Sequence, residues 1–504
     1  MTTTVELRHG VYRDSVKLMQ ISRSLSASPG VQAALVAMAT PLNLDLLPRL
    51  GIDPSAADGA TPNDLLVALR SDDDASMMSA LAMLSGLLAA RDAQSGGDGF
   101  GAPVAPRTTA SALKRSGAGL AVISVPGRNA FVEAMDALRS GASVMLFSDN
   151  VTVEEEIALK DEATRYGSLV MGPDCGTAVV GGVGLGFANV VRPGPVGLVA
   201  ASGTGAQQIC SLLDAAGVGV SAVLGTGGRD LSHAVAARSM LRALEMLDQH
   251  PQTELVVVLS KPPAADVATL VRDAVGHMRT PTIVGFLGRG EPDLTVVNAR
   301  ILSALGLPST PPREWLAPGE RRPRHGMLRG LFSGGTLCDE AMIIASQSLG
   351  PIHSNIPLEP AWALGDDLHS EGHVMIDFGD DRLTQGRAHP MIDWTLRLDR
   401  LAEEAADPEC AVVLLDVVLG YGSHEAPASA LVPALRDARA RARADRRDLA
   451  IVVSLTGTSG DPQGLEATAL ALQEAGASVH LSNAAAARTA AALVDASALV
   501  ERTA

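Results

Sequence analysis

The chain has 504 residues and a formal net charge of −16 at pH 7, with 47% hydrophobic and 3% aromatic residues. At roughly 100–200 residues per domain, this length predicts three or four domains. The sequence has no cluster of Lys and Arg interleaved with aromatics, which argues against binding to nucleic acid or to a membrane surface. It also has no apolar run near the roughly 18 residues that span a bilayer, and its opening lacks a signal segment. We therefore expect a cytoplasmic protein.

The cysteine content points the same way. Cys175, Cys210, Cys338 and Cys410 are far apart and form no CxxC pair. This spacing excludes a zinc site built on paired thiolates and is typical of the reduced thiols of a cytosolic protein. No metal site is predicted.

Residues 1–92 are predicted to form an N-terminal α/β segment. The expected elements are a strand at VELRHGVY, a helix from Asp14 to about Ser26, strands at Val31 to Thr40 and Asp64 to Arg70, and a long helix from Asp74 to about Asp92. Residues 93–107 are rich in Gly, Ser and Pro, and are predicted to be a flexible linker.

From residue 108 onward, apolar strands alternate with helices of about 10 to 15 residues, which indicates right-handed βαβ units and parallel sheets. The predicted fold class is therefore α/β with several doubly wound parallel-sheet domains. We expect domains at 108–190, 191–307 and 326–504, and a Pro- and Arg-rich linker at 308–325. Ligands of such sheets bind at the carboxyl ends of the strands.

The stretch from Val196 to Gly217 indicates an anion site. It reads as a strand, a small-residue turn from Ser202 to Gly205, and a helix from Ala206. Such a turn leaves unpaired N–H groups at the positive end of a helix, where glycines let an anion approach the backbone. The same pattern returns at Leu328 to Ala345, around Ser333-Gly334-Gly335-Thr336. Two such turns suggest related domains facing one anionic group.

Several motifs carry a resemblance to a known family. The runs ISVPGRNAFVEAMDALRSG, MGPDCGTA, GLVAASGTGAQQI and VLGTGGRD resemble the α subunit of succinyl-CoA synthetase. The runs FSGGTLCDEAM, MIDFGDD, LLDVVLGYG and VSLTGT resemble the carboxyl-terminal ligase domain of its β subunit. Their fusion, together with GRAHPMID at residues 386–393, resembles the FdrA family over most of residues 108–490. The resemblance implies a CoA-binding-like Rossmann domain followed by two flavodoxin-like ligase domains.

The resemblance implies that the loop Gly172 to Gly176 and the helix start at Ser202 border CoA and phosphate sites. Two departures limit the chemistry. The segment Phe286 to Val297 has no histidine where the synthetases carry the phosphorylated one, and no stretch is long enough for an ATP-grasp domain. The route from NTP through phosphohistidine therefore cannot run inside this chain alone. The opening segment lacks the glycines of the family's first nucleotide loop, which leaves CoA a possible ligand only.

For the FdrA family, the resemblance implies partner subunits and an oxamate carbamoyltransferase activity in purine or allantoin catabolism. Carbamoyl phosphate and oxamate would give oxalurate and phosphate, reversibly. The missing histidine favours this interpretation, because ready-made carbamoyl phosphate needs no phosphohistidine. One alternative is an acyl-CoA synthetase whose ATP-grasp domain lies on a partner subunit, and the other is a non-catalytic scaffold subunit. We also expect a homo-oligomer.

The predicted phosphate- and substrate-binding residues lie in the glycine turns and in two strand-end loops. They are Ser202, Gly203, Thr204, Gly205, Ser333, Gly334, Gly335, Thr336, Pro173, Asp174, Cys175, Gly227 and Gly228. For the Ser and Thr residues of the turns, the competing interpretation is simple helix capping.

Three residues are predicted to be catalytic: Arg229, Arg387 and His389. Either arginine could pair with phosphate or carboxylate, and His389 could move a proton. The competing interpretations are a surface salt bridge for Arg229 and a structural turn before Pro390 for the other two.

Weaker candidates complete the set. A helix start could lower the thiol pKa of Cys175 or Cys338 and make it a nucleophile. Asp393 could orient His389 or cap the next helix, and His424 could contact substrate from a loop. The remaining candidates are Asp377, Asp380 and Asp381 for magnesium or a solvated turn, and His9 and Arg13 for a ligand if the opening segment completes the first sheet.

Overall fold

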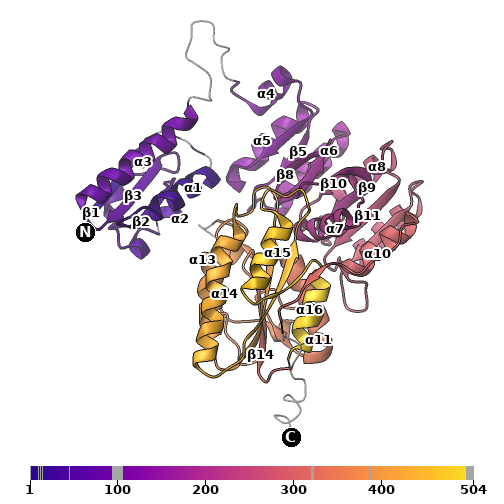
Figure 1. Cartoon of the computed structure of the whole chain (residues 1–504). Coiled ribbons are helices and arrows are strands. Elements are labelled where there is room, and N and C mark those ends of the chain that lie inside the picture. Colours follow the sequence, from indigo (N-terminus) through magenta and orange to yellow (C-terminus); the bar gives the residue numbers. More distant parts are fainter. Residues whose placement is uncertain are drawn as a thin grey trace. The chain divides into compact units, whose positions relative to one another are not determined.

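A computed structural model describes residues 2–9, 11, 13, 15–44, 46–92, 106–318, 323–384 and 388–494. The chain divides into two compact units (Figure 1). Unit 1 comprises Met1–Ala105 with Asp381–Ala388, and unit 2 comprises Pro106–Asp380 with His389–Ala504. Most of the expected linker, residues 93–105, lies outside the described residues. None of the helices among the described residues has both the length and the apolar character needed to cross a membrane.

Unit 1 is built on a three-stranded antiparallel sheet in the order β1-β3-β2. Its elements are β1 (Thr2–Arg8), α1 (Ser15–Ser26), β2 (Val31–Met38), α2 (Pro41–Leu44), η1 (Pro48–Leu50), η2 (Pro54–Ala57), β3 (Leu65–Ser71), α3 (Asp74–Asp92) and α12 (Asp381–Thr384). Alternate residues of the strands pack on α1 and α3. The core between the sheet and these helices buries Leu18, Leu25, Val67 and Leu84.

The N-terminal sheet corrects one expectation. The opening strand pairs with β3 rather than with the first parallel sheet, so it does not supply a βα nucleotide loop to that sheet. His9 Nδ1 lies 3.2 Å from Asp64 Oδ1, at the start of β3. The condition under which His9 and Arg13 would line a ligand is therefore not met.

Unit 2 begins with a small parallel sheet in the order β4-β5-β6. Its elements are α4 (Thr109–Ser116), β4 (Leu120–Ile123), α5 (Gly127–Arg139), β5 (Ser143–Leu146), α6 (Val153–Tyr166) and β6 (Val170–Met171). The strict alternation follows the sequence pattern, and the capping boxes at Thr108 and Thr152 fix where α4 and α6 start.

The second sheet of unit 2 has six strands in the order β12-β11-β9-β10-β7-β8. Its elements are β7 (Thr177–Val180), β8 (Val183–Gly186), β9 (Pro193–Ala200), α7 (Gly203–Ala215), β10 (Val220–Gly225), α8 (Arg238–Asp248), β11 (Leu255–Ser260), α9 (Ala265–Gly276), β12 (Thr282–Phe286) and α10 (Leu294–Ala304). Strands β9 to β12 are parallel, as expected. The hairpin β7–β8 is antiparallel, and although it falls within residues 108–190, it pairs with β10 of this sheet.

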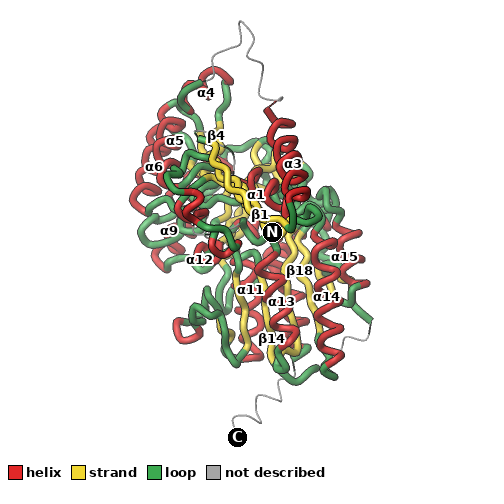
Figure 2. The backbone as a smooth tube through the Cα atoms, turned by 90° about the vertical axis from the view of Figure 1, so that its left-hand side faces the viewer, coloured by secondary structure: helices red, strands yellow, loops and turns green. Residues whose placement is uncertain are grey.

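The third sheet has seven strands in the order β13-β19-β18-β17-β14-β16-β15, and all neighbours except β13 and β19 are parallel. Helices α13, α14 and α15 cover one face, and α11 and α16 cover the other (Figures 1 and 2). The elements are β13 (Glu314–Trp315), β14 (Met327–Phe332), α11 (Gly335–Leu349), β15 (Ile352–His353), η3 (Pro360–Trp362), β16 (His373–Asp377), α13 (Thr395–Ala406), β17 (Cys410–Val418), α14 (Pro427–Ala444), β18 (Ala450–Thr456), α15 (Leu465–Glu474), β19 (Ser478–His480) and α16 (Asn483–Ala492).

A layer of four helices joins the second and third sheets. Helices α7 and α10 from one sheet pack against α11 and α16 from the other, and one hydrophobic core runs through both. Buried polar groups add specific contacts: Ser211 Oγ donates to Gly457 O at 2.6 Å, and Asn189 Nδ2 donates to Asp461 Oδ2 at 2.7 Å. The two sheets therefore form one packed block, which fixes the start of α7 relative to the start of α11.

Glu340 is a buried acid inside this helical layer. Its carboxylate accepts from Leu294 N at the start of α10 and from Asn483 Nδ2 at the start of α16, both at 2.7 Å. Burial raises the pKa of Glu340 to about 7, although these two donors oppose the shift. At pH 5 to 6 the folded protein therefore holds this carboxyl mostly protonated, whereas the same carboxyl in the unfolded chain is mostly ionised.

We predict that the contribution of the Glu340 carboxyl to the free energy of unfolding falls as the pH rises. Because its pKa in the folded protein lies above the ordinary value, this contribution decreases between about pH 4.5 and 7, by up to ~3 kcal/mol. Denaturant unfolding of the wild type and of Glu340→Gln between pH 5 and 8 measures this, because the difference between the two cancels other titrating groups. A pH-independent difference would contradict the prediction.

A second buried charge joins α6 to the start of α8. Lys160 Nζ donates to Glu156 Oε1 at 2.7 Å, to Asp230 Oδ1 at 2.8 Å and to Thr226 O at 3.1 Å. The Asp230 carboxylate also accepts from the backbone N–H groups of Ser239 and Met240. This lysine thus adds a buried ionic link between the first and second sheets of unit 2, which also share a hydrophobic core.

We predict that Lys160→Met destabilises unit 2 by roughly 3–5 kcal/mol, because it leaves the buried Asp230 carboxylate without its cation and Glu156 with the partly exposed Arg229 alone. Arg165→Met on the same helix is the matched control, because Arg165 is 75% exposed and its ion pair with Glu162 contributes at most about 1 kcal/mol. Circular dichroism at increasing denaturant reports both values. Equal midpoints for the two variants would contradict the prediction.

Candidate functional site

The two glycine turns of the sequence meet inside unit 2. Ser202 Oγ, before α7, donates to Thr336 Oγ1, in the first turn of α11, at 2.7 Å. A Cβ atom placed on Gly334 would lie 2.6 Å from Thr204 Cγ2, so only a glycine allows the helix starts to come this close. The N-termini of α7 and α11 therefore converge on one point within a single chain.

The start of α7 is capped by its own turn. Ser202 is the N-cap residue with extended backbone, and its Oγ accepts from Gly205 N at 3.0 Å. Ser202 therefore has the helix-capping role that is the alternative to phosphate binding by its side chain. The N–H groups of Gly203 and Thr204 belong to the first helical turn and have no acceptor within the helix. Those two groups are what the turn can offer to an anion.

The start of α11 already holds an anion, which is a side chain of the protein. Asp416, inside β17, accepts from Ser333 N at 2.8 Å, from Ser333 Oγ at 3.0 Å and from Gly334 N at 2.9 Å. These N–H groups, expected to bind phosphate, are therefore occupied by a carboxylate. Gly335 and Thr336 are the turn residues whose N–H groups remain as donors, because they begin the helix.

Arg397 balances the charge of Asp416. Its guanidinium is buried and donates to Asp416 Oδ1 at 2.8 Å and to Leu331 O at 2.9 Å. It also lies over the Trp394 ring, 4.7 Å from the centroid. This ion pair ties α13 to strands β14 and β17 and holds the carboxylate under the glycine turn.

Lys261 and two further carboxylates complete the charged cluster. Lys261 follows β11, and its Nζ lies 3.1 Å from Asp339 Oδ2 on α11. A Cβ atom placed on Gly335 would lie 2.6 Å from Asp377 Oδ2 and 2.8 Å from Lys261 Nζ. The Lys261 side chain as a whole is 40% exposed.

The pKa values of this cluster reflect its surplus of acids. Burial raises the pKa of Asp377 to about 7, with Lys261 and Gly379 N–H opposing and Asp339 and Asp416 adding to the shift. Burial alone would lower the pKa of Lys261, but Asp339 and Asp377 outweigh it and the pKa is raised. The lysine is therefore charged at pH 7, while Asp377 is about half protonated.

His389 lies beside the same cluster. A Cβ atom placed on Gly379 would lie 3.1 Å from both His389 Nε2 and Asp377 Oδ1. Burial lowers the pKa of His389 to about 4, and Arg397 adds to the shift. Its Nδ1 accepts from Met391 N at 3.2 Å, so the neutral ring carries its proton on Nε2. His389 therefore presents an N–H donor at neutral pH and is a poor base. This differs from the expectation that it moves a proton.

Of the other two predicted catalytic residues, Arg387 lies outside the described residues. Arg229 NH2 lies 3.0 Å from Glu156 Oε2 and donates to Val151 O at 2.8 Å, which is the salt-bridge alternative. Asp393 Oδ1 accepts from Thr395 N at 3.0 Å and so caps the start of α13.

The strand-end loops support one another. Gly227 has a positive φ, and a Cβ on it would lie 2.3 Å from Pro173 O, so its role is close packing. Asp174 also has a positive φ, and its N–H donates to Ser148 O. Gly228 has open space around its Cα. The loop reaches the candidate site through Thr177, whose Oγ1 would lie 3.2 Å from a Cβ on Gly203.

The cysteine hypothesis is wrong on physical grounds. Burial raises the pKa of Cys175 to about 12 and that of Cys338 well above its ordinary value, so neither is a thiolate at neutral pH. His424 is buried, and its Nδ1 accepts from Ala426 N at 3.0 Å. Asp377, considered for magnesium, has its Oδ2 within 3 Å of the same point as Lys261 Nζ, the position of a Cβ on Gly335. The described residues contain no group of three or more His, Cys, Asp or Glu suited to a metal.

The charged residues of this site were mostly missed in the sequence. Lys261, Asp377 and Asp416 share one signal, since each ends or directly follows a run of apolar strand residues. The rule that ligands bind at the carboxyl ends of parallel strands applies to all three. Asp339 and Arg397 lie on helices and carry no such signal.

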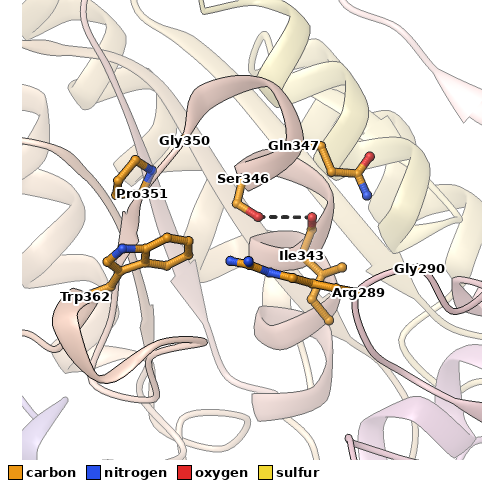
Figure 3. Close-up of a pocket in the computed structure, with 8 residues that line it drawn as sticks. All are labelled: Arg289, Gly290, Ile343, Ser346, Gln347, Gly350, Pro351 and Trp362. Atoms are coloured by element: carbon orange, nitrogen blue, oxygen red, sulfur yellow. Dashed lines mark hydrogen bonds between the residues drawn. The ribbon is translucent and has the colours of Figure 1, made fainter.

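A surface pocket of about 350 Å³ lies at the other end of α11 (Figure 3). Arg289 projects into it over the Trp362 ring, with Ser346 and Gln347 on the helix side. Arg289 also pairs with Glu359 at 2.7 Å. The pocket is separate from the convergent helix starts.

Comparison with known families matches two separate parts of the chain, the N-terminal part that forms most of unit 1 and the third sheet of unit 2. Residues 331–493 match the CoA-ligase family, and residues 1–103 match the family described as AllF, heavy metal-associated domain. Residues 1–103 contain no cysteine, so they cannot provide the thiolates that soft metals require. The residues present do not fit a thiolate-bound heavy metal.

Individual relatives cover different parts of the chain. The protein YahF of Escherichia coli (strain K12) is 40% identical over 94% of this chain and 95% of its own length. The succinate–CoA ligase [ADP-forming] subunit alpha 2 of Archaeoglobus fulgidus is 24% identical over 50% of this chain and 77% of its own. The solved acetyl-coenzyme A synthetase 1 of Ca. Korarchaeum cryptofilum is 15% identical over 81% of this chain and 90% of its own, with a TM-score of 0.31. At that TM-score the structural likeness carries no argument.

These matches support a CoA-ligase-like enzyme family rather than a carbamoyltransferase. They agree with the α/β fold and with the resemblance to succinyl-CoA synthetase. At 40% identity over 94% of its length, the chain belongs to the protein family of YahF, and it carries a CoA-ligase domain behind an N-terminal domain of the AllF type.

Proposed function

We propose that this chain is a subunit of an acyl-CoA ligase of the FdrA type, which transfers an acyl group between an acyl phosphate and the thiol of CoA. The observation that carries the proposal is the convergence of α7 and α11, joined by the bond of 2.7 Å between Ser202 and Thr336. Each helix start carries about half a positive charge and points its free N–H groups outward. Two such ends at one point suit a phosphoryl group.

The chemistry assigned to the chain is electrostatic. In the forward reaction the thiol sulfur attacks the acyl carbon, the C–O bond to the phosphoryl group breaks, the thiol proton is lost, and phosphate leaves. The first-turn N–H groups of Gly203, Thr204, Gly335 and Thr336 would stabilise the charge of the leaving phosphate with donors already in place. His389 Nε2–H adds a neutral donor beside them.

The nucleotide step is assigned to a partner subunit. The sequence has no stretch long enough for an ATP-grasp domain, and the relative from Archaeoglobus fulgidus is itself named as a subunit. The chain then contributes the two ligase sheets and the site between them. A cytoplasmic location and a homo-oligomeric core belong to the same proposal.

Carbamoyl transfer from carbamoyl phosphate to oxamate is the second candidate. One observation favours it: the loop between β12 and α10, residues 287–293, contains no histidine. A ready-made acyl phosphate would enter the same site without a phosphohistidine. The two candidates share the phosphate position and differ in the acceptor, which is a thiol in one and the amide nitrogen of oxamate in the other.

We predict that Gly335→Ala weakens acyl phosphate binding at least tenfold, because its methyl group would enter the space between Asp377 and Lys261. Tenfold corresponds to about 1.4 kcal/mol, within the range of one charge-assisted hydrogen bond. Calorimetric titration of the purified chain with acetyl phosphate, carbamoyl phosphate and CoA measures the change.

Gly276→Ala at the end of α9 is the matched control, because nothing lies within 4 Å of its added methyl group. Its affinities should equal those of the wild type. Binding of CoA together with an acyl phosphate supports the ligase, whereas binding of carbamoyl phosphate and oxamate without CoA supports carbamoyl transfer. A wild-type chain that binds neither acyl phosphate would overturn the proposed function.

A further inference from the structure

We propose that Lys261 is the cationic ligand of the acyl phosphate, and that the anion binds together with one proton, which the Asp377 carboxyl takes up. This inference rests on the proposed function and adds to it the residue that neutralises the substrate. Lys261 and Asp377 come from the ends of β11 and β16, which belong to two different sheets. They meet only because α7 and α11 hold those sheets together.

Geometry places Lys261 where an anion at the helix starts would lie. Its Nζ and Asp377 Oδ2 both lie within 3 Å of the point where a Cβ on Gly335 would sit, at 2.8 and 2.6 Å. Gly335 is the first residue of α11, so its N–H points along the helix axis toward the same space. The lysine side chain as a whole is 40% exposed, so part of it lies at the surface.

The charges around Asp377 explain why a proton must enter. The facing groups are Lys261 from β11, Asp339 and Cys338 from α11, Asp416 from β17, Arg397 from α13, and His389. With the thiol and the imidazole neutral, three carboxylates face two cations. The ionised cluster is thus already negative by one charge, and a bound dianion would raise that to three.

Asp377 is the carboxyl that can most readily change its charge. Asp416 accepts three hydrogen bonds from the Ser333–Gly334 turn and forms the ion pair with Arg397, so its protonation would weaken the turn and give up the ion pair. Among the described residues, the Asp377 side chain accepts a single hydrogen bond, from Gly379 N to Oδ1 at 2.9 Å. Its Oδ2 faces Gly335 and can hold a proton. A neutral Asp377 also frees Lys261 to turn toward the anion.

The consequence is a pH-linked affinity. Burial already raises the pKa of Asp377 to about 7, and an anion beside it raises that pKa further. At pH 8 the free site is mostly ionised, so binding takes up a proton. The affinity for a dianion then falls as the pH rises above 7, by at most tenfold per unit.

Calorimetric titration of the full chain with acetyl phosphate at pH 8 tests this, in two buffers of different ionisation enthalpy. We expect the wild type to take up close to one proton on binding. Asp377→Asn should bind without proton uptake and with pH-independent affinity. Lys261→Met should lose at least tenfold in affinity, Lys261→Arg should recover part of it, and Lys114→Met on α4 should leave it unchanged.

The outcomes separate this inference from the function on which it rests. Equal heats in both buffers for the wild type, or wild-type affinity in Lys261→Met, would overturn the proton-linked site and leave acyl phosphate binding standing. No binding of acetyl phosphate by the wild type would overturn both. If Lys261→Met fails to fold, the heats of Asp377→Asn in the two buffers decide the question. Proton uptake by Asp377→Asn equal to that of the wild type would contradict the inference that Asp377 takes up the proton.

Discussion

The architecture of unit 2 depends on two helix N-termini that face each other. The positive ends of α7 and α11 would repel one another if nothing negative lay near them. Carboxylates of the chain itself offset this repulsion. Asp416 accepts hydrogen bonds from the N–H groups of the Ser333–Gly334 turn, and Asp377 packs on the first residue of α11. The acids that gather at this site are therefore a consequence of the helix geometry.

Those acids in turn require cations and a proton. Arg397 is buried and pairs through Nη2 with Asp416 and with the strand carbonyl of Leu331, so it acts as part of the framework. Lys261 differs, because its side chain is partly exposed and its ammonium group lies between Asp339 and Asp377 with no ion pair to Asp416. The site thus has a rigid half that keeps the glycine turn in place and an adjustable half that can respond to a ligand.

The glycine turns and most of the secondary structure could be predicted from the sequence. The parts of the site that could not be predicted share a physical cause. The turns at Ser202 and Ser333 were found because small residues between a strand and a helix leave a local pattern, and most helices and strands followed from periodicity. The occupation of one turn by Asp416 could not be found, because it joins residues 83 apart through parallel strand pairing. The environment of His389 was misjudged for the same reason: burial, which lowers its pKa, is a property of the packed sheets.

The site exists only while the helical layer between the two sheets is intact. Ser202 and Thr336 are separated by 134 residues in the chain and belong to different sheets. Glu340, Asn483 and the first residue of α10 lock that layer a few turns away. A substitution there would move one helix start relative to the other and alter anion binding without touching the ligand. Fusion of both ligase sheets in one polypeptide removes the entropy cost of bringing the halves together, so a modest interface is enough to hold the helix ends at hydrogen-bonding distance.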